Sequence, residues 1–133
     1  MNTDETQIKD GKDYSLQAVT QNLIGAAFEV HNILGFGFLE KVYQRAMQVE
    51  LLTRGIAVEL EPKIQVKFKG VVVGDYLADL LVEQKIVVEL KTDPAYLTVH
   101  EAQLLNELRG TGMKVGYLIN FGRERVDYKR MIF

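Results

Sequence analysis

The stretch Asp75-Tyr-Leu-Ala-Asp79-Leu-Leu-Val82, followed after three polar residues by Ile86-Val-Val-Glu89-Leu-Lys91, decides how this chain folds. Val, Leu and Ile are enriched in strands, so both segments are predicted as buried neighbouring strands. A buried charge is costly unless it is paired or binds a metal. The three charged residues Asp79, Glu89 and Lys91 therefore need a shared explanation.

Strand geometry sets a condition on that explanation. Side chains alternate between the two faces of a strand, so Glu89 and Lys91 share a face. Asp79 can reach Glu89 only if the strands pair antiparallel with Val82 opposite Ile86, because a shift of one residue sends Glu89 to the other face. The sequence therefore predicts a hairpin with a three-residue loop, although this loop lacks the Gly or Asn that such loops favour.

Length and composition limit the class of protein. A chain of 133 residues with 26% charged residues is typical of one soluble globular domain, expected over 15–133 after a flexible lead-in over 1–14. No apolar run approaches the ~18 residues that a membrane helix needs, and the polar start lacks the core of a signal peptide. Without cysteine, disulfides and thiolate metal sites are excluded, and a cytoplasmic location is the default expectation.

The net charge of −2 is unusual for a protein that binds nucleic acid mainly through phosphates. Positive charge is instead local, in one predicted strand and near the C-terminus. A divalent ion bound at an acidic site would remove part of its repulsion for phosphate, so the charge weakens a nucleic-acid function without excluding it. The two basic groups are Lys63, Lys67 and Lys69, and Arg123, Arg125, Lys129 and Arg130.

Three helices are predicted from hydrophobic periodicity. The first begins at the N-cap Ser15 and stops at the glycines that follow Leu34. The second covers 38–53, and the third begins with Thr98-Val-His-Glu101, which has the pattern of a capping box. The second helix is expected to turn four residues inward: Leu39, Val42, Ala46 and Val49.

The strands alternate or run apolar between glycine and proline residues. Together with the helices they give the order αα-ββββ-α-ββ, which predicts a mixed α/β fold with a central mixed β-sheet flanked by helices. The predicted strand segments are 56–60, 64–69, 71–73, 76–82, 85–91, 114–121 and 125–133.

The Asp79 and Glu89-Leu-Lys91 pattern resembles the PD-(D/E)XK nuclease superfamily, in which acidic residues on neighbouring strands hold a divalent metal. Upstream, Gly37-Phe-Leu-Glu40-Lys-Val-Tyr43 resembles the signature of the GxxExxY family, a branch of that superfamily. The resemblance covers roughly residues 16–131 and implies a restriction-endonuclease-like core. Further segments that resemble the family are Glu29-Val-His31, Leu34-Gly35, Ala102-Gln103-Leu-Leu-Asn106 and Leu118-Ile-Asn-Phe-Gly122.

This resemblance implies a metal-dependent nuclease that cleaves phosphodiester bonds, with DNA favoured over RNA as the nucleic-acid partner. Asp79, Glu89 and the backbone carbonyl of Leu90 would bind Mg²⁺ or Mn²⁺, because magnesium prefers oxygen ligands. Lys91 would orient the attacking water or stabilise charge on the phosphate. Glu40 would reach the metal directly or through water. For the strand residues the alternative is a buried ion pair without a catalytic role.

Further candidates lie on the helices. By the same resemblance, Gln103 corresponds to a glutamine that contacts the phosphate or the water in some branches of the superfamily. His100 and His31 are candidates to assist proton transfer, the alternative being hydrogen bonds at helix ends. Tyr43 either packs in the core or takes part in the chemistry. Glu107 stands where the resembled family commonly has a tyrosine, which adds negative charge near a phosphate site.

Two classes of function remain open from the sequence: a magnesium-dependent nuclease, and a non-catalytic nuclease-fold module that binds or regulates. The acidic net charge, the small size and Glu107 favour the module. The intact set of Asp79, Glu89, Lys91 and Glu40 favours the nuclease. A chain this small cannot easily hold two nucleic-acid strands alone, so a homodimer is expected, and no membrane partner is.

Overall fold

A five-stranded mixed β-sheet forms the centre of the fold in this computed structural model, which describes residues 8–9 and 11–133. Neighbouring strands of this sheet pair antiparallel, except that the third and fourth strands across the sheet pair parallel. A helix connects that parallel pair, as the crossover between parallel strands requires. In spatial order the strands are β3 (Val58–Leu60), β6 (Leu80–Val82), β7 (Ile86–Lys91), β8 (Val115–Asn120) and β9 (Asp127–Ile132).

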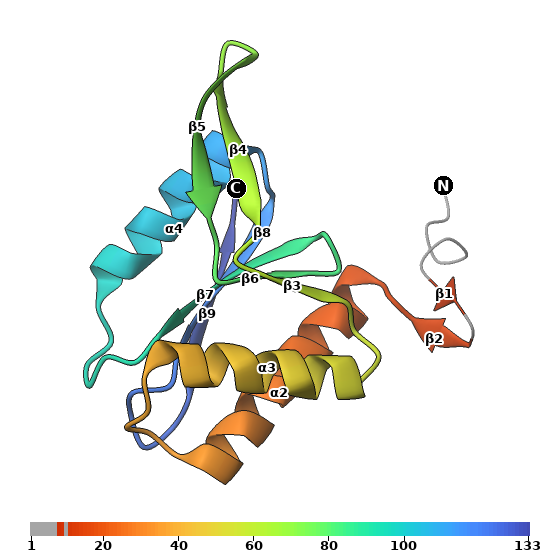
Figure 1. Cartoon of the computed structure of the whole chain (residues 1–133), viewed down its shortest axis with the longest axis vertical. Coiled ribbons are helices and arrows are strands. Elements are labelled where there is room, and N and C mark those ends of the chain that lie inside the picture. The colour runs from red at the N-terminus through yellow and green to blue at the C-terminus, as the bar shows by residue number, and fades with distance from the viewer. Residues whose placement is uncertain (1–7, 10) are drawn as a thin grey trace.

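Helices cover both faces of the sheet (Figure 1). α2 (Leu16–Leu34) and α3 (Glu40–Thr53) lie on one face, and α4 (Thr98–Thr111), which connects β7 to β8, lies on the other. Because alternate residues of β7 face opposite sides, Val88 packs in the α2–α3 core and Val87 packs in the α4 core. The predicted mixed α/β architecture is confirmed.

β4 (Lys63–Phe68) and β5 (Val71–Leu77) form a separate antiparallel hairpin that projects from the body of the molecule (Figure 1). Its two turn residues, Lys69 and Gly70, have positive φ of 51° and 79°, as a two-residue hairpin loop requires. The single strand predicted over 76–82 is wrong: β5 ends at Leu77, and β6 begins three residues later with different partners. The five segments predicted between the second and third helices correspond to β3 to β7, but the boundary between the third and fourth lies after Leu77 rather than at Gly74, and the predicted order with four strands is one strand short.

The inward face of α3 also differs from the prediction. Leu39, at its N-cap, is 80% exposed, and Val49 is 65% exposed, whereas Tyr43 and Met47 are fully buried. Of the four residues expected to face inward, only Ala46 packs against the core. Apolar residues occur on both sides of this helix, so periodicity alone does not select the buried face. The buried residues of α3 are Tyr43, Gln44, Met47 and Leu51, and the third wrongly placed residue, Val42, is exposed.

The helix termini were predicted with mixed success. Ser15 is the N-cap of α2, and its hydroxyl accepts a hydrogen bond from the Ala18 N–H at 3.3 Å. The capping box of α4 is wrong, because Leu97 is the N-cap, without a side-chain bond, and Thr98 is already helical. Gly112 follows α4 in the left-handed conformation, as a helix C-terminus favours.

The expected lead-in over 1–14 is only partly described, since residues 1–7 and 10 lie outside the described residues. Within it, β1 (Ile8–Lys9) and β2 (Lys12–Asp13) pair antiparallel. Across residues 8–9 and 11–133, no helix is both long and apolar enough to cross a membrane.

Candidate functional site

β6 and β7 pair in the register that the sequence predicted. Val82 lies opposite Ile86, and the pairing continues back to Leu80, the first residue of β6, opposite Val88. One further step brings Asp79 level with Glu89, because antiparallel partners move in opposite directions along the chain. Glu89 and Lys91 lie on the same face of β7. The three charged residues thus meet at one end of the sheet.

The loop between β6 and β7 supplies left-handed residues without Gly or Asn. Glu83 and Gln84 have φ of 51° and 56°. The Glu83 carboxylate accepts a hydrogen bond from the Ala57 N–H at 2.7 Å, and the Glu83 N–H donates to the Ala57 carbonyl at 2.9 Å. These bonds to the segment before β3 compensate for a conformation that non-glycine residues rarely adopt.

Asp79 lies in the break between β5 and β6, held by three hydrogen bonds from different parts of the chain. Its Oδ2 accepts from the Leu90 N–H at 2.7 Å. Its carbonyl oxygen accepts from the Glu61 N–H at 3.1 Å and from Nε2 of Gln44 at 3.0 Å. Gln44 was not predicted as a site residue, because its bond joins residues 35 positions apart and leaves no local pattern.

Glu89 lies on the α4 side of β7, next to Tyr76 and Glu107. The Tyr76 hydroxyl donates a hydrogen bond to Oε2 of Glu89. Burial, followed by the negative charges of Glu89 and Glu107, raises the pKa of Tyr76 far above its ordinary value. Oε2 of Glu107 is buried without a hydrogen-bond partner among the described residues. Tyr76 was not predicted as a site residue, whereas Glu107 was recognised in the sequence as an added negative charge near the site.

Burial makes both strand carboxylates harder to ionise. It raises the pKa of Asp79, against the opposing effects of the Leu90 N–H and the Lys91 ammonium. Burial and the neighbouring charge of Asp79 raise the pKa of Glu89 to about 8, and Lys91 opposes this shift too. Two neighbouring carboxyl groups repel each other when both are ionised, and a nearby cation stabilises both as carboxylates.

Glu40 approaches Asp79 from the α3 side of the sheet. It begins α3 and is exposed at the rim of a cavity of about 110 Å³. Partial burial raises the pKa of Glu40, Asp79 and Asp93 add to this rise, and Lys91 opposes it. Glu40 therefore shares its electrostatic environment with the strand residues. The cavity is lined by Glu40, Lys41, Gln44, Glu61, Asp79 and Leu90.

The donor atoms at this place fit a hard divalent ion. Oδ2 of Asp79 and Oε2 of Glu89 each accept one hydrogen bond, which leaves each carboxylate further lone pairs with which to bind a metal. In the described part of the chain, no three His, Asp or Glu side chains are arranged to hold a metal by themselves. Magnesium commonly takes one or two protein carboxylates and keeps several waters, which matches two carboxylates with the carbonyl of Leu90 beside them.

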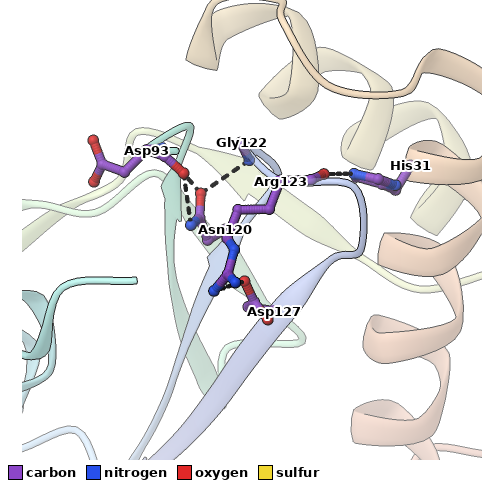
Figure 2. A network of polar contacts seen from close by, with 6 residues as sticks. All are labelled: His31, Asp93, Asn120, Gly122, Arg123 and Asp127. Atoms are coloured by element: carbon purple, nitrogen blue, oxygen red, sulfur yellow. Dashed lines mark hydrogen bonds and ion pairs between the residues drawn. The ribbon is translucent and has the colours of Figure 1, made fainter. Parts of the chain in front are cut away.

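Two of the predicted supporting residues make their contacts elsewhere. The Tyr43 hydroxyl donates to the Gly35 carbonyl at 2.6 Å, and its ring stacks on Phe121 with centroids 4.5 Å apart. Nε2 of His31 is hydrogen-bonded to the Arg123 carbonyl oxygen at 2.7 Å (Figure 2). Both side chains therefore fix loops next to the core rather than facing Asp79 and Glu89.

The remaining two predicted residues lie on α4. Nε2 of His100 is hydrogen-bonded to Oδ2 of Asp93 at 2.8 Å, and His100 lies close enough to Glu40 to lower the pKa of Glu40. Gln103 is exposed, one turn before Glu107 on the same helix. The structure thus brings His100 to the edge of the site and leaves Gln103 open to an incoming molecule.

Asn120, at the end of β8, forms hydrogen bonds with the backbone of the segment that follows Lys91 (Figure 2). Its Oδ1 accepts from the N–H groups of Asp93 and Gly122, and its Nδ2 donates to the Asp93 carbonyl, each at 3.0 Å. A Cβ at Gly122 would lie 2.3 Å from the Asp93 carbonyl oxygen, so only glycine fits there. This network holds the end of β7, and with it Lys91, against β8.

Comparison with known proteins identifies the class. Residues 17–131 match the model of the PD-(D/E)XK nuclease superfamily, so the chain belongs to that superfamily, as predicted. The crystal structure of SSO0001 is similar in fold, with a TM-score of 0.50 and 20% identity over 70% of this chain. The similar region is 50% of SSO0001, so this chain spans about half of that protein. No curated protein matches the chain.

Proposed function

We propose that this chain is a metal-dependent nuclease that hydrolyses phosphodiester bonds in nucleic acid, and that it belongs to the GxxExxY branch of its superfamily. The observation that carries the proposal is the register of β6 and β7, because its extension by one residue beyond the Leu80–Val88 pair brings Asp79 level with Glu89. Glu40, from the Gly37–Tyr43 signature, lines the cavity at Asp79 and supports the assignment to that branch.

The proposed roles follow from position and chemistry. Asp79, Glu89 and the Leu90 carbonyl are the proposed ligands of Mg²⁺ or Mn²⁺, and Glu40 orients a water beside them. When bound, the ion supplies positive charge that polarises the phosphodiester and lowers the pKa of a water. Lys91 stabilises the negative charge that grows on the phosphate oxygens while water attacks phosphorus and the P–O bond breaks.

Two residues of α4 complete the proposal. Gln103, exposed on the same helix as Glu107, contacts a phosphate oxygen of the substrate. His100, held by Asp93 at 2.8 Å, accepts the proton that the attacking water loses. Tyr43 and His31 act only through the packing of the loops that they hold.

One observation favours the alternative, a non-catalytic nuclease-fold module that binds or regulates. Glu107 places a third carboxylate near Glu89 and Lys91, where a phosphate would approach. Repulsion between Glu107 and a phosphate would weaken substrate binding unless a cation neutralises it. Cleavage by the purified protein decides between the two functions.

The experiment incubates the purified protein with single- and double-stranded DNA and RNA, in the presence of Mg²⁺, Mn²⁺ or EDTA. We expect cleavage only with metal, and we expect Lys91→Ala to lower its rate by roughly 10²–10³, the usual effect of removing one charge-stabilising donor. Lys129→Ala on β9 is the matched control and should cleave like the original chain. Absence of cleavage on every substrate, or equal cleavage by the Lys91 variant, would refute the proposed catalytic role.

A further inference from the structure

One face of the β4–β5 hairpin packs against the core, and the other face does not. Ile64 and Tyr76 pack with the core under α4. Val66 also turns toward that helix, since a Cβ at Gly110 would meet its side chain at 3.2 Å. A two-stranded hairpin is marginal by itself, so this packing explains why the hairpin folds. The opposite face and the tip stay exposed.

The exposed face is positively charged in an otherwise acidic protein. The hairpin contains three lysines and one acidic residue, Asp75, whereas the whole chain has a net charge of −2. Lys63 and Lys67 lie on the same face, with exposed Gln65 between them, and Lys69 lies in the turn. A groove of about 630 Å³ beside β4 is lined by three cationic side chains and one acidic one, which are Lys63, Lys67, Arg109 and Glu59.

The tip of the hairpin adds an aromatic ring to this charge. Phe68 is 64% exposed, and Nζ of Lys69 lies 5.5 Å from the centre of its ring. Next to it, Val71 and Val73 are exposed as well. Aromatic rings beside lysines are used to stack on bases or to insert between base steps, while the ammonium groups contact phosphates.

The row of lysines begins close to the candidate metal centre and leads away from it, as a surface that binds the substrate backbone should. Lys63 pairs with Leu77, the neighbour of Tyr76, which hydrogen-bonds to Glu89. From there β4 extends outward over about 17–20 Å, the length of a strand of five to six residues. Phosphates repeat at about 3.4 Å of rise along one strand of a duplex, so the hairpin can follow about five nucleotides.

We propose that the β4–β5 hairpin is a nucleic-acid-binding arm that holds the substrate backbone beside the Glu89 site. Its lysines contact phosphates, and Phe68 contacts a base. The inference rests on the proposed nuclease function and assigns the substrate a binding surface. Charge complementarity favours nucleic acid as the partner, because the arm has a net positive charge while the rest of the chain has a net negative charge.

The test measures binding of fluorescent single- and double-stranded DNA and RNA by anisotropy in EDTA, where cleavage does not occur, at several salt concentrations. One variant replaces Lys63, Lys67 and Lys69 with Gln. A matched variant replaces Arg125, Lys129 and Arg130 with Gln, which removes the same charge near the C-terminus. A third variant is Phe68→Ala. Thermal melting verifies that each protein is folded, and light scattering measures its mass.

The hairpin triple variant should lose affinity, and its slope of log affinity against log salt should be smaller by about 2 to 3, since each phosphate contact contributes about 0.9 on duplex DNA. Phe68→Ala should weaken binding roughly tenfold at all salt concentrations. The C-terminal triple variant should keep the original salt slope. These results together would support the arm.

Other results would refute the proposal that the hairpin binds nucleic acid. If the original chain binds and cleaves nucleic acid but both triple variants weaken binding equally, or neither does, the proposed function stands and the arm is wrong. If Phe68→Ala turns a dimer into a monomer, the tip is an interface between two copies of the chain, and the proposal for a base contact fails. If the original chain binds no nucleic acid in EDTA but cleaves it with metal, the arm is refuted and the proposed function stands. If it neither binds in EDTA nor cleaves with metal, both are refuted.

Discussion

The hydroxyl of Tyr76 donates a hydrogen bond to the carboxylate of Glu89, although the two residues belong to separate β-sheets. Tyr76 comes from the projecting hairpin, and Glu89 comes from the central sheet. The bond uses one lone pair of Oε2 and restricts rotation of the Glu89 carboxylate, which keeps further lone pairs for a metal. Tyr76 therefore fixes the direction in which one candidate ligand points.

Removing this bond should weaken metal binding. In Tyr76→Phe, Glu89 keeps its carboxyl group but loses the donor that orients it, and such losses typically cost about 10–100-fold in metal affinity. Calorimetric titration with Mn²⁺ measures the change. Tyr128→Phe, which removes a hydroxyl from a partly exposed ring on β9, is the control and should bind like the original chain. Equal affinities for the two variants would show that Tyr76 does not position Glu89.

Divalent ions should raise the melting temperature of the protein. An ion that binds only the folded state stabilises it by mass action, by about 2.7 kcal/mol at a concentration one hundred times its dissociation constant. Differential scanning calorimetry with increasing Mn²⁺ or Mg²⁺ measures this rise. Glu89→Gln should abolish it, whereas Glu124→Gln, an exposed change outside the site, should not. A melting temperature that does not respond to millimolar Mn²⁺ would contradict the metal site.

Without metal, the protein should become less stable as the pH rises toward 8. The pKa of Glu89 is about 8 in the folded protein, above its ordinary value of 4.5, so the folded state binds more protons than the unfolded state between these values. The free energy of unfolding therefore falls with pH across that window. The raised pKa values of Asp79 and Glu107 act in the same direction.

Urea unfolding in EDTA at a series of pH values across this window measures the dependence. Glu89→Gln should be more stable than the original chain near pH 8 and should show a flatter pH profile, because the buried charge is gone. Glu124→Gln should follow the original profile. A free energy of unfolding that rises between about pH 5 and 8 would contradict the raised pKa of Glu89.

Gln44 should matter for both stability and metal binding. Gln44→Ala removes the bond to the Asp79 carbonyl and leaves a space on the buried face of α3, so it should destabilise the protein by about 1–3 kcal/mol. Gln48→Ala, on the same helix but only half-buried, is the matched control and should cost less. Urea unfolding measures the stability, and titration with Mn²⁺ measures the affinity. A Gln44 variant with unchanged affinity would show that this bond does not hold Asp79 in place.

The β6–β7 register could be predicted from the sequence because it depends on local parity. Asp79 and Glu89 are ten residues apart along the chain, and the alternation of side chains leaves few ways for them to meet. The same argument placed Lys91. Glu40 was located through its signature rather than through geometry, since nothing in α3 itself indicates which end faces the sheet.

Features that depend on distant contacts could not be predicted. The break at Asp79 arises because β5 pairs with β4 while β6 pairs with β3 and β7, and the sequence across it, 76–82, has no glycine or proline to mark a break. Val49 was expected to be buried, but α3 packs through Tyr43 and Met47 instead. The contacts of Gln44 and Tyr76 likewise join segments whose proximity only the complete fold determines.

The three hydrogen bonds that hold Asp79 have a consequence for the order in which the protein folds. They come from Gln44 on α3, Glu61 before β4 and Leu90 on β7, so the geometry of Asp79 is complete only after all three segments have docked. Local β6–β7 pairing forms early in such a scheme, because it closes a short loop. A folding intermediate that contains this hairpin but lacks docked α3 would still lack the native metal-binding geometry, so recovery of metal affinity would report the docking of α3 rather than formation of the hairpin.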